Sequence, residues 1–242
     1  MANLIEQVSN KVSKAYEPID NLNKIFKKGV EVTYPKRKLQ AMIGEGAACT
    51  STLSAPDRIF LFDEASSHIE EGKFLEVGSY LGASAIVLAE ALKQSADTLS
   101  NPKIYCIDTW QNDAMTEGQK DTYQNFLDNT KNWSDLVIPI RGNSQSVVLP
   151  EEERYDVVFI DGDHSYEGCR SDVQRFAPLV REGGCLILDD HISYTGVTRV
   201  VGELLTSGEW YIGASHYNVV SLYCDRKSVS KTKRLRRWNR SL

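Results

Sequence analysis

From residue 73 onward, short apolar runs alternate with longer segments in which apolar residues recur at helical spacing. The apolar runs predict strands at 73–77, 103–108, 136–140, 155–160, 184–188, 210–215 and 218–224. Helices are predicted between them at 82–95, 117–131, 145–149, 166–180 and 195–207. This alternation is typical of an α/β fold with a parallel, doubly wound sheet, and the short connection between the last two strands predicts that they pair antiparallel.

The first 71 residues lack this alternation. Helices are predicted there at 2–15, 18–28 and 56–70, with a loop around Tyr34–Pro35 and along the GEGAAC stretch from Gly44 to Cys49. We therefore expect three parts in the chain: a helical extension over 1–71 that forms a lid or a homodimer contact, the sheet domain over 72–225, and a C-terminal tail over 226–242.

The composition, with 41% hydrophobic and 25% charged residues, is that of a soluble enzyme large enough for a sizeable core. The formal net charge is −5, but the 17 residues from Arg226 onward carry eight Lys or Arg and no acid. An acidic body argues against a general nucleic-acid binder. The tail is either an ordinary solvated chain end or a peripheral contact with an anionic surface, with Trp238 as an interfacial anchor.

No apolar run near the N-terminus reads as a signal peptide, and none reaches the roughly 18 residues of a spanning helix. The five cysteines have no metal-type spacing, and Cys106 and Cys185 fall inside predicted strands. These features predict reduced core cysteines and a cytoplasmic location.

Two neighbouring predicted strands end in acids: Asp161 and Asp163 follow the fourth strand, and Asp189 and Asp190 follow the fifth. Parallel strands lie about 4.8 Å apart, so these carboxylates meet at one sheet edge and repel one another unless a cation lies among them. A divalent cation such as Mg²⁺, which prefers oxygen ligands, is predicted at this edge. The alternative is that some of these polar residues, Asp163 and His164 above all, cap the helix that follows.

A glycine turn follows the first strand. Glu76 precedes Gly78 and Gly82, and a helix opens near Ala83, so backbone N–H groups face a ligand that the glycines allow to approach closely. The spacing E-x-G-x-x-x-G differs from the G-x-G-x-x-G of dinucleotide folds. A plain strand-to-helix turn is the alternative.

The next two strands offer further contacts for a nucleoside. Asp108 ends the second predicted strand, where an acid accepts both hydroxyls of a ribose; a turn or cap role is the alternative. Asn143 and Ser144 follow the third strand and supply small polar groups for an adenine edge, although a helix cap explains them equally well.

The glycine turn, the IDTW stretch around Asp108, and FIDGDHSYEG followed by GGCLILDDH together resemble the class I S-adenosylmethionine-dependent methyltransferases. Within these enzymes the chain resembles methyltransferase family 24 and the macrocin-type sugar O-methyltransferases. The resemblance covers about residues 72–224. The pairing of IDGDHSYEG with DDH is the specific part, since the glycine turn alone is common.

The resemblance implies a Rossmann-like sheet of seven strands, mostly parallel and with an antiparallel last strand, that binds S-adenosylmethionine. It implies cofactor contacts from Glu76, Gly78, Ser79, Gly82, Asp108, Thr109, Asn143, Ser144 and Asp161. It also implies that Asp161, Asp189 and Asp190 bind Mg²⁺ and that Asp163 is the general base.

The chain departs from this pattern in carrying His164 and His191 beside the carboxylates. Histidine titrates near neutral pH, so either is a further candidate for the base or for a metal ligand, and the base assignment stays open among Asp163, His164 and His191. His68 and His216 have no acidic cluster near them in the sequence and are interpreted as structural or surface residues.

The loop after the second strand lies where an acceptor would approach the cofactor. Trp110, Gln111 and Asp113 are candidate acceptor contacts, with the alternative that Trp110 covers the adenine. Methyl transfer to an alcohol needs a positioned, deprotonated oxygen, which a cation and a base together supply. The resemblance therefore implies a metal-assisted O-methyltransferase for a hydroxyl of a sugar or small polar metabolite.

Two alternatives remain open from the sequence. One is an N-methyltransferase or another transferase that uses S-adenosylmethionine, because the acceptor half of the site is less well defined than the cofactor half. The other is a non-catalytic cofactor-binding module tethered by the basic tail.

Overall fold

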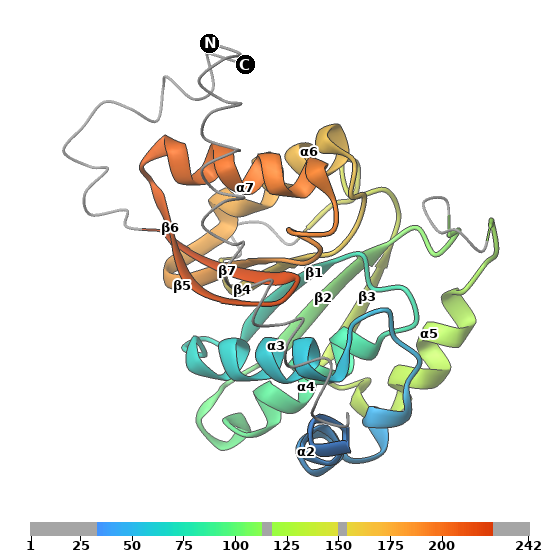
Figure 1. Ribbon diagram of the computed structural model, residues 1–242. Helices are drawn as coiled ribbons and strands as arrows, with labels where there is room; N and C mark the ends of the chain where they lie inside the picture. Colours follow the sequence, from blue (N-terminus) through green and yellow to red (C-terminus); the bar gives the residue numbers. More distant parts are fainter. Residues whose placement is uncertain (1–32, 113–117, 150–153, 225–242) are drawn as a thin grey trace.

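The computed structural model describes residues 33–112, 118–149 and 154–224, and shows one seven-stranded sheet between two layers of helices (Figure 1). The strands are β1 Lys73–Val77, β2 Lys103–Asp108, β3 Val137–Arg141, β4 Tyr155–Ile160, β5 Val180–Leu188, β6 Trp210–His216 and β7 Val219–Cys224. They lie in the order β3-β2-β1-β4-β5-β7-β6. The strand order therefore switches between β1 and β4: β2 and β3 lie on one side of β1, and β4 to β7 lie on the other. Ligands of open α/β sheets bind at such a switch point.

Strands β1 to β5 pair parallel, whereas β7 runs antiparallel to both β5 and β6. In this register Leu188 of β5 pairs with Val220 of β7, which brings the β6–β7 hairpin beside the end of β5. The predicted Rossmann-like sheet with an antiparallel last strand is confirmed. Strand β5 begins at Val180 and is thus longer than predicted.

Helices cover both faces of the sheet (Figure 1). The helices are α2 Thr33–Ile43, α3 Ala55–Ser67, α4 Ala83–Lys93, α5 Tyr123–Thr130, α6 Tyr166–Phe176 and α7 Thr195–Ser207. The first four lie on one face, and α6 and α7 lie on the other. The described part of the N-terminal segment thus packs into the main core through residues such as Leu39 and Leu61.

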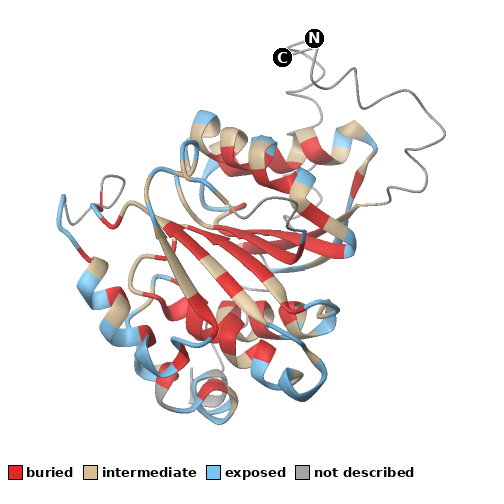
Figure 2. Cartoon of the chain, turned by 180° about the vertical axis from the view of Figure 1, so that it is seen from behind, coloured by how far each residue is buried: buried red, intermediate tan, exposed pale blue. Residues whose placement is uncertain are grey.

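Successive side chains of the central strands point to opposite cores. Phe74 and Phe159 belong to the core under α2 to α5, whereas Leu75 and Val158 belong to the core under α6 and α7. Because both faces of the sheet are covered, these strands are buried along their length, as the red central strands of Figure 2 show. This explains the continuous apolar runs in the sequence.

Several predicted elements were wrong. The loop predicted around Tyr34–Pro35 is the first turn of α2, a position that tolerates proline because its missing N–H would have no helical partner there. The GEGAAC loop contains a 3₁₀ helix at Gly44–Ala48. The helix predicted at 117–131 begins only at Tyr123. The predicted helices 2–15 and 18–28 and the basic tail lie outside the described residues.

No helix forms at 145–149. The Asn143 side chain accepts the backbone N–H of Gln145 over 2.8 Å, and the Ser144 and Gln145 side chains each donate to Asp172 of α6 over 2.6 Å. These side-chain contacts replace the helical pattern that the sequence indicated.

A buried carboxylate fixes the amino-terminal ends of β1 and β4. Asp156 is fully buried, and its Oδ2 accepts the backbone N–H groups of Glu70, Glu71 and Gly72 over 3.1, 3.0 and 2.7 Å. The Arg181 guanidinium binds its other oxygen. This contact lies at the sheet edge opposite the acids that follow β4 and β5.

Cys106 and Cys185 are buried in β2 and β5, as predicted. Within the described ranges, no helix has the length and apolar character needed to span a bilayer.

Candidate active site

The glycine turn after β1 touches the turn after β4. Gly78 has φ 89°, and a Cβ placed on it would lie 2.1 Å from the backbone oxygen of Asp161, so only glycine fits. Asp161 also donates its backbone N–H to Val77 over 2.8 Å. Gly82, with φ 89°, caps the start of α4 without a side chain, which leaves the first N–H groups of this helix open toward a ligand.

Asp108 holds the glycine turn from β2. Its Oδ2 accepts the backbone N–H of Tyr80 over 2.8 Å, and its Oδ1 accepts that of Trp110 over 2.6 Å. A carboxylate oxygen has two lone pairs, so each oxygen still has capacity for a ribose hydroxyl. Thr109 is half-buried beside it.

Trp110 is a core residue, which corrects its prediction as an acceptor contact or adenine cover. It is fully buried, its ring packs on Tyr123 and Phe126, and its indole N–H donates to the Tyr80 carbonyl over 2.8 Å. Gln111 is exposed, and Asp113 lies outside the described residues.

Glu76 lies at the end of β1 with no exposed surface. Neither carboxylate oxygen has a hydrogen-bond partner of good geometry among the described residues. Burial raises the pKa of Glu76 to about 7, although the nearby Ser79 and Ser84 hydroxyls lower it in part. A buried acid with spare acceptors beside a glycine turn suits a ligand that carries an ammonium group.

Asn143 and Ser144 lie on the β3–β4 connection. Asn143 is exposed, and its side chain holds the turn through Gln145, whereas the Ser144 hydroxyl donates to Asp172. Both predicted adenine contacts therefore have structural roles in shaping this loop.

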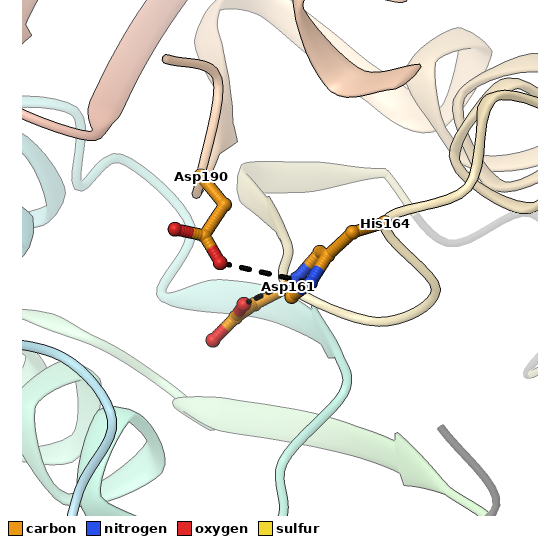
Figure 3. Close-up of side chains that lie close together, drawn as sticks. All are labelled: Asp161, His164 and Asp190. Carbon is orange, nitrogen blue, oxygen red and sulfur yellow. Dashed lines mark hydrogen bonds and ion pairs between the residues drawn. The ribbon is translucent and has the colours of Figure 1, made fainter. Parts of the chain in front are cut away.

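The acids after β4 and β5 form the second half of the site. Figure 3 shows the His164 ring beside both Asp161 and Asp190: Nε2 lies 3.2 Å from Oδ1 of Asp161, and Nδ1 lies 3.6 Å from Oδ2 of Asp190. One potential ligand atom from each residue lies within 4.8 Å of the others. The predicted meeting of strand-end carboxylates is thus present, with a histidine added to it.

Asp189 lies beside this cluster and is deeply buried, with 7% of its surface exposed. Its Oδ1 is buried without a hydrogen-bond partner among the described residues. Burial, followed by the charges of Asp161 and Asp190, raises the pKa of Asp189 to about 9. The group whose ligand atoms lie within 4.8 Å of one another thus contains His164 and not the predicted Asp189. Asp189 adds a buried carboxylate oxygen, Oδ1, beside this group, and such oxygens are ligands that a divalent cation prefers.

The pKa values of Asp161, His164 and Asp190 are shifted by burial and by their charges on one another. Burial raises the pKa of Asp161 and Asp190, and the nearby His164 lowers both in part. Burial lowers the pKa of His164, but its hydrogen bond to Asp161 and the surrounding carboxylates outweigh burial and raise it. Without a cation, the cluster therefore retains protons that separate carboxylates would release.

Asp190 is held by a residue that sequence reasoning missed. Asn218, in the β6–β7 hairpin, donates its side-chain N–H to Oδ1 of Asp190 over 2.9 Å. Asp190 itself has φ 56°, a left-handed conformation that aspartate tolerates better than most residues. The antiparallel register of β7 on β5 is the signal that would have placed this hairpin at the acidic edge.

The other two candidate bases are placed differently. Asp163 is exposed, accepts the backbone N–H of Ser165 over 2.8 Å, and lies over Gly168 in the first turn of α6. The N-cap of α6 is Ser165, whose hydroxyl accepts the backbone N–H of Gly168, so Asp163 shapes the turn before the helix and does not itself cap it. His191 is 3% exposed, and its Nδ1 lies 2.6 Å from the Asn218 carbonyl.

His216 lies at the surface, as expected, with 48% of its side chain exposed and, among the described residues, a single acid beside it. Its Nδ1 lies 3.4 Å from Oδ1 of Asp57 in α3, and its ring stacks on Phe60. His68 bonds the Glu64 carbonyl and packs on Tyr223, as expected for a structural residue.

Comparison with known proteins identifies a methyltransferase domain in the chain. Residues 75–191 match the family model described as a methyltransferase domain, Methyltransf_24. This segment contains the glycine turn and both acidic strand ends.

Solved structures share the fold at low sequence identity. The O-methyltransferase NovP has a TM-score of 0.61 and 17% identity, with 77% of this chain and 88% of NovP covered. CalS11, a TDP-rhamnose 3′-O-methyltransferase of calicheamicin biosynthesis, has a TM-score of 0.55 and 13% identity, with 79% of this chain and 93% of CalS11 covered. An O-methyltransferase from Bacillus cereus in complex with SAH has a TM-score of 0.54 and 16% identity, with 88% of this chain and 99% of that protein covered. The chain therefore contains a methyltransferase domain at residues 75–191 and has the fold of the class I methyltransferases.

Proposed function

We propose that this methyltransferase is a divalent-metal-assisted O-methyltransferase that acts on a hydroxyl of a sugar or other small polar metabolite. The observation that carries the proposal is the cluster of Asp161, His164 and Asp190 beside the buried Asp189, whose Oδ1 has no hydrogen-bond partner among the described residues. It lies next to the glycine turn, where a methyl donor is expected. The similarity to NovP and to the sugar-modifying CalS11 supports the choice of oxygen as the acceptor atom.

The cofactor half is assigned to the turn after β1 and to β2. Glu76 offers buried acceptor oxygens for the ammonium group of the methionine part, and the start of α4 offers backbone N–H groups. Asp108 offers its remaining lone pairs to the ribose. S-adenosylmethionine supplies an electrophilic methyl group on sulfur.

Asp161, Asp189 and Asp190 are the residues that would hold the cation, because their carboxylate oxygens are the ligands that Mg²⁺ prefers. A bound divalent cation supplies a Lewis acid that lowers the pKa of an acceptor hydroxyl. Asn218 fixes the direction of Asp190 and so supports the same donor set.

We assign the base to His164 in preference to Asp163 or His191. Asp163 is turned onto the first turn of α6, and His191 is almost fully buried, whereas 26% of the His164 side chain is exposed within the cluster. A cation bound among the carboxylates would offset the negative charges that raise the pKa of His164 and so favour its neutral form. In the proposed step, the acceptor O–H gives its proton to a ring nitrogen of this neutral His164. Its oxygen forms a bond to the methyl carbon while the carbon–sulfur bond breaks, which leaves S-adenosylhomocysteine.

The test compares two neighbouring variants in a methyl-transfer assay with Mg²⁺ and a panel of sugars and polyols. For His164→Gln we expect a loss in kcat of about 10²- to 10⁴-fold with unchanged cofactor affinity, because proton removal is lost. For Asp163→Asn we expect kcat within a few-fold of the parent. Full activity of His164→Gln, or activity that survives removal of divalent cations, would contradict the proposal. Methylation of amines alone would favour the N-methyltransferase alternative.

A further inference from the structure

The aromatic side chain of Tyr194 lies at the edge of the acidic cluster and has no role in the proposed chemistry. Tyr194 lies four residues after Asp190, and 47% of its surface is exposed. Its ring centroid lies 4.5 Å from that of His164, with an angle of 39° between the ring planes. Nothing in the methyl-transfer chemistry described above requires a tyrosine there.

The exposure of Tyr194 is unusual in the described part of the chain. Large apolar side chains that are exposed there are few: Val148, Ile192, Tyr194, Tyr211 and Ile212. Ile192 is 41% exposed and precedes Tyr194 by two residues, so an apolar rim follows directly on the metal-binding carboxylates. Apolar groups placed beside buried charges are typical of small-molecule sites.

The backbone beneath Tyr194 is held in place. Tyr194 donates its N–H to the Asp190 carbonyl over 3.0 Å and precedes the first residue of α7. Ser193 exchanges hydrogen bonds with the Asn218 side chain, and the Thr198 hydroxyl donates to the His191 carbonyl over 2.5 Å. The ring therefore stands on an anchored turn and offers a preformed surface.

We infer that Tyr194 is the acceptor platform of this enzyme: the C–H face of a saturated ring, such as a pyranose, packs on it. This inference rests on the proposed O-methyl transfer and narrows its acceptor to ring-shaped alcohols. A ring packed on Tyr194 lies next to the His164 imidazole, so that one of its hydroxyls points toward the carboxylates. Tyr194 thus determines specificity and position, and takes no part in proton transfer.

Ligand-observed NMR tests the platform independently of turnover. The probes are methyl α-D-glucopyranoside and methyl α-L-rhamnopyranoside, with the open-chain polyol sorbitol as a ringless control, added to full-length protein with S-adenosylhomocysteine and Mg²⁺. Saturation of the aromatic protons is expected to transfer to C–H groups of a pyranoside but not to sorbitol. Tyr194→Ala should weaken this transfer about 3- to 10-fold, whereas Tyr194→Phe should keep it.

Tyr211→Ala is the matched control, since Tyr211 is 52% exposed on β6 and packs on Tyr223 instead of His164. Equal transfer in the parent and in Tyr194→Ala, or equal transfer to sorbitol, would overturn the inference. Because the NMR experiment measures binding, it tests the role of Tyr194 whether or not any probe is methylated. With an active acceptor, Tyr194→Ala should raise KM and leave the pH dependence of kcat unchanged; a shifted pH profile would instead mean that the ring only supports His164.

Discussion

The Asn218 side chain donates a hydrogen bond of 2.9 Å to Asp190, so the hairpin at one end of the sheet holds a carboxylate that follows β5. The same side chain reaches Ser193 over 2.7 Å. One amide therefore orients both a proposed metal ligand and the turn that carries the acceptor rim.

Asn218→Ala is expected to weaken Mg²⁺ or Mn²⁺ binding by about 10- to 100-fold, because residues that orient metal ligands typically have effects of this size. Calorimetric titration with Mn²⁺ measures it. Asn132→Ala, at an exposed position in the 3₁₀ helix Lys131–Trp133, is the control and should bind as the parent does. Unchanged affinity in Asn218→Ala would show that Asp190 is not a ligand or needs no support.

Gly78→Ala is expected to abolish cofactor binding, because the added Cβ would meet the Asp161 backbone at 2.1 Å and φ is 89°. Isothermal titration with S-adenosylmethionine checks this. Gly202→Ala in α7 has open space around its Cβ, and helix propensity predicts a gain of about 1 kcal/mol in stability with normal binding. Normal binding by Gly78→Ala would mean that the two turns separate easily.

Asp156→Asn is expected to reduce the free energy of unfolding by about 3–5 kcal/mol, because it leaves the Arg181 guanidinium without its buried partner. Urea denaturation at pH 7 measures the change. The exposed Asp121–Arg141 pair provides the comparison, and Asp121→Asn should cost less than about 1 kcal/mol. Since Asp156 lies at the opposite sheet edge, the folded variant should keep its affinity for the cofactor.

The stability of the cofactor-free protein should fall as pH rises toward neutrality because of Glu76. Its folded-state pKa of about 7 lies above the ordinary value of 4.5, so the folded state binds this proton more tightly than the unfolded state. This contribution to stability is complete below pH 4.5 and is lost as pH rises through about 7. Urea midpoints of the parent and of Glu76→Gln between pH 5 and 8 should therefore converge at low pH, with the parent losing more stability. Parallel curves would mean that Glu76 has an ordinary pKa.

The sequence predicted the strands better than the loops. Strands such as 155–160 are buried on both faces, so their apolar runs are unambiguous. The connection at 145–149 was mispredicted because its conformation depends on Asp172, a residue more than 20 positions away in the chain. Local patterns contain no information about such a contact.

For the site, strand ends were predictable but side-chain directions were not. Asp161 and Asp190 meet because parallel strands end at one edge, which the order of elements implies. Whether Asp163 or His164 faces the cluster depends on the start of α6, where Asp163 bonds to Ser165. The role of Asn218 depends on how β7 pairs with β5, which became clear only from the register.

Because β7 lies between β5 and β6, the β6–β7 hairpin lies at the acceptor side of the proposed site, where substitutions would alter acceptor specificity. Groups proposed for the donor come from β1, the start of α4 and β2, whereas those proposed for the acceptor come from the chain after Ile160, including the hairpin at Asn218. Substitutions in the last third of the domain are therefore free to redesign acceptor choice while the donor pocket stays intact. Exchange of residues 189–224 with those of a relative is the natural route to a methyltransferase of new selectivity.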